Sequence, residues 1–336
     1  MKIDANSVTF EPQDMAFVKK FGILKATEMA LDYHAEHPNL PFLYDAEQLA
    51  GFLGISRGEL NDIVNHIQKE YKETRLPKKD GTYRSLCVPS IRLRFCQDPI
   101  KEKILPQLPV SKFATAYQKG STTRENAEPH IGKKFLLKLD ITDFFGSITF
   151  EQVQRAAFNT RYVSRQVGYL LTSLCCKDDS LPQGAATSPA LSNIVMYRFD
   201  DYIGRWCSQR QIAYTRYCDD MTFSANRPLY GVYQKVKTML REMGFELNES
   251  KTHFIGNDNR QSVTGLVVNE KLSIPSGYKR DLRQEVYYAL KFGVEDSVLH
   301  GHRSDFVEDG RPICCPTYML HLMGKVQYVL QIEPEN

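Results

Sequence analysis

The sequence predicts an α+β protein divided into two or three subdomains. Its 336 residues exceed the usual size of a single hydrophobic core. Both ends of the chain carry apolar residues at helical spacing, whereas the middle holds short strand-like runs joined by tight turns. Apolar residues make up 42% of the chain and charged residues 25%, which is ordinary for a globular protein.

The first 65 residues are predicted to be helical. Phe17, Phe21 and Leu24 recur at roughly helical spacing, and a Pro-containing break follows near residue 40. Residues 45–64 then read as two short helices joined by a turn, with Ser56 as the N-cap of the second helix. Such a pair either binds DNA or serves as a plain packing unit, and packing is the more common role.

A β-hairpin is predicted over residues 76–89, because Asp80-Gly81 separates two strand-like runs. Its tip carries Lys78, Lys79 and Arg84, and a helix is expected to follow over 91–105. Residues 69–134 contain fifteen basic and seven acidic side chains, although the whole chain has a net charge of only +3. A basic block of this kind suits a polyphosphate substrate; the alternative is a solvated, lysine-rich face.

Three carboxylates stand out in the strand-forming centre. Asp219 and Asp220 lie at the tip of a predicted hairpin over 212–224, and Asp140 ends a buried strand over 136–141. Adjacent carboxylates repel each other at this range, so a fixed pair favours a cation between them. Hard oxygen ligands suit Mg²⁺, and three carboxylates can hold two such ions. For an isolated pair, the alternative is a solvated Asp-Asp turn.

The intervening segments complete the expected pattern. Residues 150–175 are predicted to be mostly helical, and 232–243 form an amphipathic helix. Another helix is expected to begin at Thr187-Ser188-Pro189, with a hydroxyl N-cap and Pro in the first turn. From about Ser276 onward the chain is predicted to be helical again.

Taken in order, these segments resemble the reverse transcriptases, and the retron reverse transcriptases of bacteria most closely. The resemblance runs from about residue 71 to residue 333 and rests on five segments: Leu-Asp-Ile-Thr-Asp-Phe-Phe at 139–145, Leu-Pro-Gln-Gly-Ala-Ala-Thr-Ser-Pro at 181–189, Tyr-Cys-Asp-Asp at 217–220, Asn-Ala-Glu-Pro-His at 126–130 and Val-Thr-Gly at 263–265. The last two are similar to the N-A-x-x-H and V-T-G motifs of the retron subgroup. Cys218 and Ala186 depart from the family pattern, which more often has Ala and Pro there.

The resemblance implies a right-hand polymerase fold. Its parts would be an N-terminal helical region (1–65), fingers (66–135 with part of 150–180), an antiparallel palm sheet flanked by helices (136–272) and a helical thumb (273–336). Asp140, Asp219 and Asp220 would hold two Mg²⁺ ions, with the Ile141 carbonyl as a further ligand. Lys251 would protonate the leaving pyrophosphate; a simple surface lysine is the alternative.

The resemblance also implies roles in substrate binding. Lys78 and Arg84 would grip the triphosphate of the incoming dNTP, Gln183 would position nucleotide and template, and Phe145 would exclude a 2′-hydroxyl. The alternative for Phe145 is a plain core aromatic. A structured RNA would be held by residues of the two retron motifs: Asn126, His130, Val263, Thr264 and Gly265. For His130, a hydrogen-bonded structural role is the alternative.

The implied activity is RNA-templated DNA synthesis on a cognate structured non-coding RNA. The product would be branched multicopy single-stranded DNA (msDNA), primed from the 2′-hydroxyl of an internal guanosine. The resemblance further implies antiphage defence with an effector protein encoded nearby. The alternatives are a group II intron-like, diversity-generating or abortive-infection reverse transcriptase, against which the short C-terminal part and the two retron motifs argue, or a catalytically silent RNA-binding scaffold. Without a signal peptide or a long apolar run, we expect a cytoplasmic protein that does not use a membrane.

Overall fold

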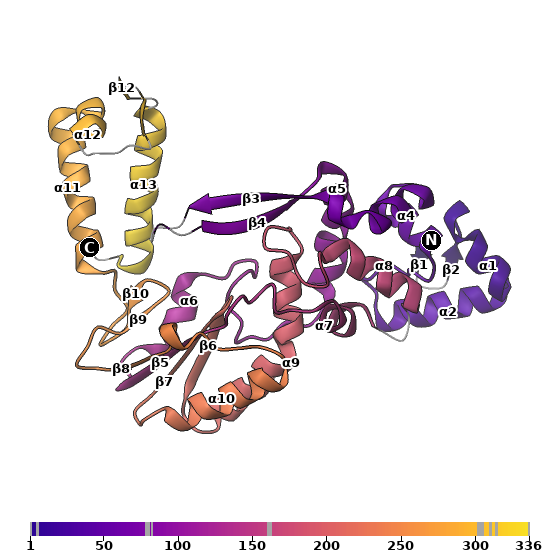
Figure 1. Ribbon diagram of the computed structural model, residues 1–336, viewed down its shortest axis with the longest axis horizontal. Helices are drawn as coiled ribbons and strands as arrows, with labels where there is room; N and C mark the ends of the chain where they lie inside the picture. Colours follow the sequence, from indigo (N-terminus) through magenta and orange to yellow (C-terminus); the bar gives the residue numbers. More distant parts are fainter. Residues whose placement is uncertain are drawn as a thin grey trace.

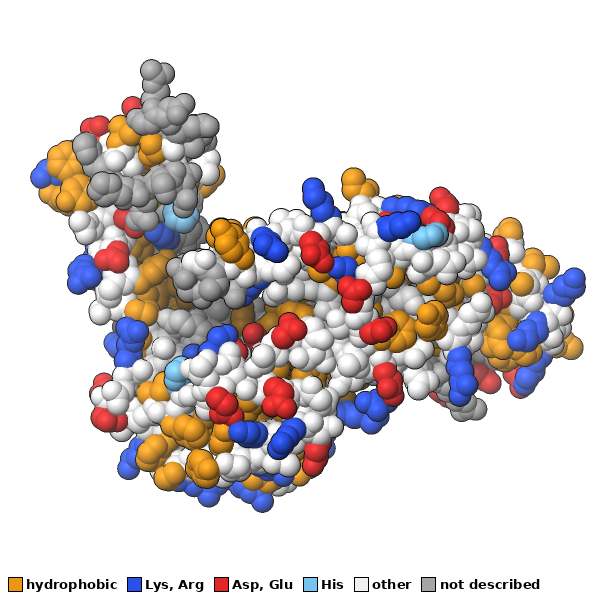
Figure 2. Space-filling model, in the orientation of Figure 1, with side chains coloured by type: hydrophobic (Ala, Val, Ile, Leu, Met, Phe, Trp, Pro, Cys, Tyr) orange, Lys and Arg blue, Asp and Glu red, His pale blue; other side chains and the backbone are white. Residues whose placement is uncertain are grey.

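The computed structural model describes residues 2–4, 7–77, 81, 83–159, 163–300, 306–308, 311–312 and 315–334. The molecule is elongated, with the N-terminal helices at one end, two long C-terminal helices at the other and a four-stranded sheet between them (Figure 1). On the face shown in Figure 2, Lys and Arg side chains are spread over all parts of the molecule. Among the described residues, no helix combines the length and apolar composition needed to cross a membrane.

The central sheet is antiparallel and has the strand order β6-β7-β5-β8. These strands are β5 (Phe135–Asp140), β6 (Ala213–Tyr217), β7 (Asp220–Ala225) and β8 (His253–Gly256). The predicted hairpin over 212–224 is therefore confirmed, and we call β6, β7 and the turn between them the aspartate hairpin. Leu137, Met221 and Phe223 of this sheet are fully buried. They pack in the main core with residues of α9 (Ser188–Ser208) and α10 (Tyr230–Glu242).

Helix α9 begins as predicted, with Pro189 in its first turn, but Thr187 makes no side-chain cap hydrogen bond. The expected helix over 150–175 is divided into α7 (Phe150–Val153), the π-helical turn η6 (Gln154–Phe158) and α8 (Arg165–Cys175). Ser164 caps α8 through its hydroxyl, which accepts from the Val167 N–H at 3.2 Å. A new N-cap in the middle of an apolar pattern explains the division, because the cap satisfies the first amides of a second helix.

The predicted hairpin over 76–89 forms from β3 (Tyr71–Pro77) and β4 (Tyr83–Pro89), which extend toward the C-terminal helices (Figure 1). Lys78 lies outside the described residues, whereas Arg84 is exposed on β4. The helix expected after the hairpin is α5 (Ile91–Pro99), which continues into η3 (Ile100–Ile104) and η4 (Leu105–Gln107).

The N-terminal region is mainly helical, as predicted. Its elements are η1 (Pro12–Asp14), α1 (Met15–Phe21), α2 (Ile23–Glu36), α3 (Ala46–Leu53), α4 (Arg57–Asn65) and η2 (Ile67–Glu70), preceded by an unpredicted two-stranded sheet of β1 (Lys2–Asp4) and β2 (Ser7–Thr9). Ser56 caps α4 and accepts from the Glu59 N–H at 3.2 Å. Leu49 of α3 and Leu60 of α4 are fully buried in the main core, which favours the packing role for this helix pair.

Two short segments flank the strands of the central sheet in sequence, one before β5 and one after β8. The N-A-x-x-H segment forms α6 (Thr123–Ala127) and η5 (Glu128–His130), and the V-T-G segment joins β9 (Ser262–Val263) to β10 (Leu266–Val267). The C-terminal unit contains α11 (Ser276–Phe292), α12 (Val294–His300), β11 (Val307–Glu308), β12 (Arg311–Pro312) and α13 (Cys315–Ile332). It has its own small core of Leu282, Val298, Tyr318 and Leu322.

Candidate active site

The register of the sheet brings two of the three predicted carboxylates together. Strand β5 pairs antiparallel with β7 so that Asp140 lies directly opposite Asp220. Asp219 lies in the adjoining turn, where its carbonyl accepts from the Ile141 N–H at 3.2 Å. Cys218 has a left-handed backbone (φ 60°), which is uncommon outside glycine and reverses the chain sharply at this point. Carboxylates separated by about eighty residues in sequence thus meet at one end of the sheet.

The electrostatics of this end of the sheet favour a bound cation. The pKa of Asp220 is raised, first by desolvation and then by the negative charges of Asp219 and Asp140. Lys251 follows on η7 (Glu249–Lys251), and its Nζ lies 2.9 Å from Oδ2 and 3.1 Å from Oδ1 of Asp140. This hydrogen bond raises the pKa of Lys251, so the ammonium stays protonated. A positive charge already lies where the carboxylates converge.

The donor set fits a divalent metal ion that is bound together with a substrate. Three carboxylates supply hard oxygen ligands, and their mutual repulsion is relieved by positive charge. Within the described part of the chain, no group of three His, Cys, Asp or Glu side chains is placed so that it could hold a metal ion by itself. An open set of this kind suits Mg²⁺, which keeps several waters and shares phosphate oxygens with the substrate.

A buried ion pair anchors the aspartate hairpin to helix α9, and the sequence did not predict this pair. Arg216 of β6 and Asp200 of α9 are both fully buried, with Nη2 to Oδ2 at 2.6 Å. The same guanidinium donates to the Cys218 carbonyl at 2.8 Å and to Asn193 Oδ1 at 3.1 Å. It therefore ties the turn before Asp219 to helix α9. The available sequence signal was Asp200 itself, a charge beside Phe199 in an apolar helix stripe.

The loop over residues 111–121 contacts the aspartate hairpin from its outer edge. The Arg216 N–H donates to the Phe113 carbonyl at 2.8 Å, and the Thr115 N–H donates to the Arg216 carbonyl at 2.8 Å. Beyond this short parallel pairing, the Tyr117 hydroxyl lies 3.0 Å from Sγ of Cys218. Desolvation raises the pKa of Cys218 to about 12, so the thiol stays neutral. The tip is held from two sides, by Arg216 and by Tyr117.

The segment containing Gln183 lies against the β3–β4 hairpin. The Cys87 N–H of β4 donates to the Gln183 carbonyl at 2.7 Å. Gly184 has φ 129°, and a Cβ there would lie 2.8 Å from the Cys87 carbonyl oxygen, so the close approach requires glycine. The Gln183 side chain is partly exposed. Phe145 is half-buried, with its ring centroid 5.5 Å from that of Phe144.

The two predicted RNA-binding motifs contact each other next to β6. Asn126 Nδ2 donates to Thr264 Oγ1 at 3.4 Å, and Thr264 Oγ1 donates to the Thr123 carbonyl at 3.2 Å. Val263 is fully buried, and Gly265 takes the left-handed backbone of the turn. Asn126 and His130 are buried as well, so in this structure any effect they have on RNA is indirect.

His130 bridges both strands of the aspartate hairpin. Its Nδ1 lies 2.7 Å from Ser224 Oγ, and its Nε2 lies 2.9 Å from Thr215 Oγ1. Thr215 donates its own proton to the Asn126 carbonyl at 3.1 Å, so Nε2 carries the imidazole proton and Ser224 donates to Nδ1. Burial lowers the pKa of His130 to about 3, which keeps the ring neutral.

Comparison with known proteins adds independent information. A family model described as reverse transcriptase (RNA-dependent DNA polymerase) matches residues 76–268, more than half of the chain. The retron Mx65 reverse transcriptase of Myxococcus xanthus is 31% identical over 321 residues, covering 88% of this chain and 70% of that protein. The retron Ec86 reverse transcriptase of Escherichia coli is 28% identical over 270 residues (79% and 84%), and the retron Ec83 enzyme of the same species is 34% identical over 233 residues (65% and 75%).

Among solved structures, apo telomerase from Candida tropicalis overlaps 78% of this chain and 56% of its own, with a TM-score of 0.48 and 11% identity. The family match confirms the right-hand polymerase fold expected from the sequence, and reverse transcriptases depend on a divalent metal ion. The RNA that they copy is the expected template partner. On these matches, the chain belongs to the reverse transcriptases, and within them to the retron reverse transcriptases, and its activity is RNA-directed DNA synthesis.

Proposed function

We propose that this reverse transcriptase copies part of a cognate structured non-coding RNA into branched msDNA, starting from a 2′-hydroxyl of that RNA. The observation that carries this proposal is the packing of the two retron motifs against the aspartate hairpin, through Asn126, Thr264 and His130. This contact couples the motifs that set the subgroup apart to the strands that bear the carboxylates. A part in antiphage defence, with a separate effector encoded nearby, belongs to the same proposal.

In this proposal Asp140, Asp219 and Asp220 are the metal ligands, with the Ile141 carbonyl beside them. Two Mg²⁺ ions would activate the attacking hydroxyl and stabilise the leaving pyrophosphate. Lys251 neutralises Asp140 before the substrate binds and can then turn its ammonium toward the pyrophosphate. The aspartate hairpin presents Asp219 and Asp220 at a fixed angle, because Arg216 and Tyr117 hold its turn.

The remaining roles concern the nucleotide. Arg84 on β4 offers a planar guanidinium to the triphosphate, and Lys78, which follows β3 in the sequence, would add a second charge. Gln183 lies at the contact between this hairpin and the palm, where nucleotide and template would meet. Phe145 would stack on the sugar. The fingers, palm and thumb boundaries expected from the sequence, at 66, 136 and 273, are part of this proposal.

The nucleic acid that copurifies with the chain tests the proposal. We expect a species that is shortened by both RNase and DNase and contains a junction cut by debranching enzyme. A copurifying linear DNA or an RNA without a branch would overturn the proposed branched product and its priming from a 2′-hydroxyl. Loss of phage protection on deletion of the neighbouring genes, with msDNA still made, would identify a separate effector.

A double substitution separates the polymerase from a silent RNA-binding scaffold. Asp219→Asn with Asp220→Asn should abolish primer extension on RNA with dNTPs and Mg²⁺ while RNA binding persists. Undiminished extension by this variant would show that these carboxylates do not take part in the chemistry.

Phe145→Ala should increase ribonucleotide incorporation, because a smaller side chain no longer excludes the 2′-hydroxyl. An unchanged ratio of rNTP to dNTP use would show that Phe145 has only a packing role.

A further inference from the structure

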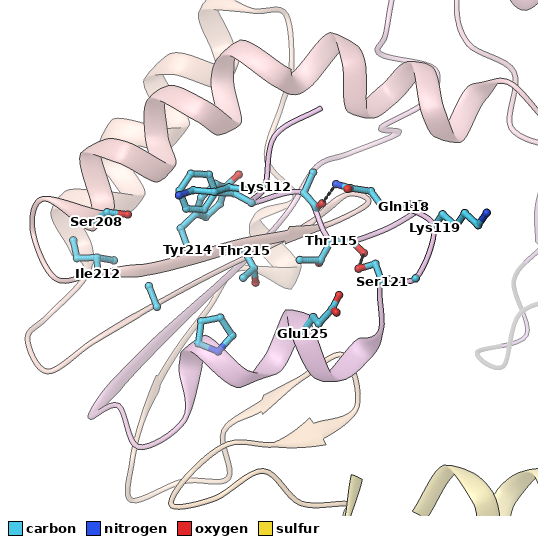
Figure 3. Close-up of a pocket in the computed structure, with 15 residues that line it drawn as sticks. Lys112, Thr115, Gln118, Lys119, Ser121, Glu125, Ser208, Ile212, Tyr214 and Thr215 are labelled. Atoms are coloured by element: carbon cyan, nitrogen blue, oxygen red, sulfur yellow. Dashed lines mark hydrogen bonds between the residues drawn. The ribbon is translucent and has the colours of Figure 1, made fainter. Parts of the chain in front are cut away.

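A hollow of about 610 Å³ lies beside the aspartate hairpin, on the side away from β7. It is enclosed by the loop over residues 111–121, the α6–η5 segment, the end of α9 and strand β6 (Figure 3). Its volume is in the range that holds a small organic ligand. Its lining is both polar and apolar, with Tyr214 and Ile212 at its floor and Gln118, Ser121 and Glu125 along its walls.

One main-chain position of β6 is open toward this hollow. The N–H and C=O of Arg216 bond to the loop at 113–115 rather than to β7. In an antiparallel ladder such positions alternate, so the N–H and C=O of Tyr214 also point away from β7. Within the described part of the chain, neither group has a main-chain partner in another element. The Tyr214 side chain is fixed elsewhere, because its hydroxyl donates to Asp200 at 2.7 Å.

The stretch of β6 whose main-chain groups are unpaired is short, because the neighbouring positions on both sides are already bonded. The loop at 113–115 already pairs with Arg216, and the Ile212 N–H already donates to the Cys207 carbonyl at 3.0 Å. An extended peptide strand needs several consecutive donors and acceptors, which this edge does not offer. A single nucleobase presents one donor and one acceptor on an edge, which matches the Tyr214 pair.

The charges at the ends of the hollow suit a phosphodiester chain. Lys112 and Lys119 lie at opposite ends, and Lys119 extends outward (Figure 3). Both are exposed, and the Lys112 Nζ lies 5.2 Å above the Phe113 ring. A nucleotide that enters between them would have a phosphate near each ammonium.

The buried residues of the N-A-x-x-H motif shape this hollow. Thr115, in its wall, donates to Asn126 Oδ1 at 2.7 Å. Thr215, in its floor, is held by His130 and by the Asn126 carbonyl. Asn126 and His130 can therefore affect RNA binding without touching RNA, through the position of these two threonines.

We propose that this hollow binds one unpaired nucleotide of RNA, with the base edge on the N–H and C=O of Tyr214 and the flanking phosphates on Lys112 and Lys119. The inference rests on the proposed RNA partner, for which it supplies a contact site outside the catalytic centre. Such a site would let the buried Asn126 and His130 influence RNA binding through Thr115 and Thr215.

Photocrosslinking tests this site. Ten-nucleotide single-stranded RNAs of each base are irradiated with the full chain, and nucleotide adducts are mapped by mass spectrometry. We expect adducts within residues 112–121 or 208–215 for at least one base. Ser208→Trp, which fills the hollow from the exposed end of α9, should remove those adducts and spare others. Adducts confined to other parts of the parent chain would overturn the proposal.

A charge variant provides the second measurement. Lys112→Gln with Lys119→Gln should weaken binding of the crosslinking RNA by about tenfold and make its salt dependence shallower by roughly one unit per lysine. The matched control is Lys19→Gln with Lys25→Gln, two exposed lysines of the N-terminal helices, outside the basic block at 69–134. Equal effects of the two pairs would overturn the site. Extension of oligo(dT) on poly(rA) should stay unchanged in every variant, so failure here is distinguishable from failure of the proposed polymerase.

Discussion

At the scale of single residues, Lys251 decides how the carboxylates behave before metal binds. Its ammonium lies 2.9 Å from Asp140, where it competes with any cation for the same oxygens. Lys251→Gln should therefore lower the Mg²⁺ concentration for half-maximal activity by about 2- to 5-fold, because exposed ion pairs contribute little. At saturating Mg²⁺, kcat should fall if the ammonium assists the leaving pyrophosphate. Magnesium titrations of primer extension measure both the half-maximal Mg²⁺ concentration and kcat. A higher Mg²⁺ requirement in Lys251→Gln would contradict competition between Lys251 and Mg²⁺ for Asp140.

Desolvation of Asp220 and its repulsion by Asp219 and Asp140 should destabilise the folded protein at neutral pH. Its folded-state pKa is raised, so the folded protein holds this proton more tightly than the unfolded chain. Stability therefore falls as pH rises through the ordinary carboxyl range, and the cost is fully present at neutral pH. Asp220→Asn should raise the melting temperature in EDTA at pH 7.5 by about 1–3 °C. The gain should shrink at low pH, where Asp220 is protonated; a gain that does not depend on pH would rule out repulsion as its cause.

Some of the site could be predicted at this scale and some could not. Asp140, Asp219 and Asp220 were found because strand ends and tight turns are local patterns in the sequence. The ion pair of Arg216 with Asp200 was not, because its members lie on different elements and each alone resembles a surface charge. The burial of Asn126 was equally hidden, since it depends on α6 packing beside β6. For His130 the sequence left open a hydrogen-bonded structural role, which its burial and its contacts to Ser224 and Thr215 favour.

At the scale of elements, the Arg216 guanidinium joins β6, the turn and α9. Arg216→Lys keeps a charge for Asp200 but cannot donate to Asn193 and the Cys218 carbonyl as well. We expect kcat to fall by about 10- to 100-fold with RNA affinity retained, because small displacements of catalytic groups are costly.

A double variant separates positioning from stability. Arg216→Met with Asp200→Leu replaces the buried pair by apolar side chains, an exchange that often preserves stability. It removes the anchor at the Cys218 carbonyl and the acceptor of the buried Tyr214 hydroxyl, so the protein should melt somewhat below the parent and lose activity at temperatures where it is still folded. Parent-like kcat in a folded double variant would show that the ion pair only packs the core.

His130 links the strands of the aspartate hairpin and makes their stability sensitive to pH. Its folded pKa of about 3 lies far below the ordinary value near 6.5, so only the unfolded chain takes up a proton between these values. Stability should decline as pH falls from 6.5 toward 3. Between pH 7.5 and pH 5, the free energy of unfolding should fall in both proteins, but by about 1–2 kcal/mol less in His130→Gln than in the parent. The exposed His253→Gln is the control, and identical pH profiles for parent and His130→Gln would refute the assignment.

Element prediction succeeded where the pattern was local. Both hairpins, α9, α10 and the start of α11 at Ser276 follow the sequence reading. Residues 150–175 are mostly helical, as predicted, but the division at Ser164, which caps α8, was not predicted, because the apolar spacing alone does not mark it. The pairing of the loop at 113–115 with β6 had no sequence signal, since it is a contact between positions about one hundred residues apart.

At the scale of the whole molecule, one close approach joins the β3–β4 hairpin of the fingers to the segment that carries Gln183. Gly184 passes the carbonyl of Cys87 so closely that a methyl group would lie 2.8 Å from its oxygen, and φ 129° disfavours any other residue. Gly184→Ala should therefore push β4 away from the segment carrying Gln183. Arg84 would then move with its strand, away from the segment that carries Gln183.

This displacement should appear in nucleotide use at temperatures where the variant is still folded. We expect Gly184→Ala to raise the KM for dNTPs by about tenfold, since substrate-positioning errors of an ångström are costly, while RNA affinity changes little. The strained backbone and the close Cβ should also lower the melting temperature, so the KM is measured well below it. Gly231→Ala on α10 is the matched control, because a Cβ there meets nothing within 4 Å. Steady-state primer extension at varied dNTP concentration compares the KM of Gly184→Ala with that of Gly231→Ala. If Gly184→Ala instead weakened RNA binding with an unchanged KM, the β3–β4 hairpin would hold the template rather than the triphosphate.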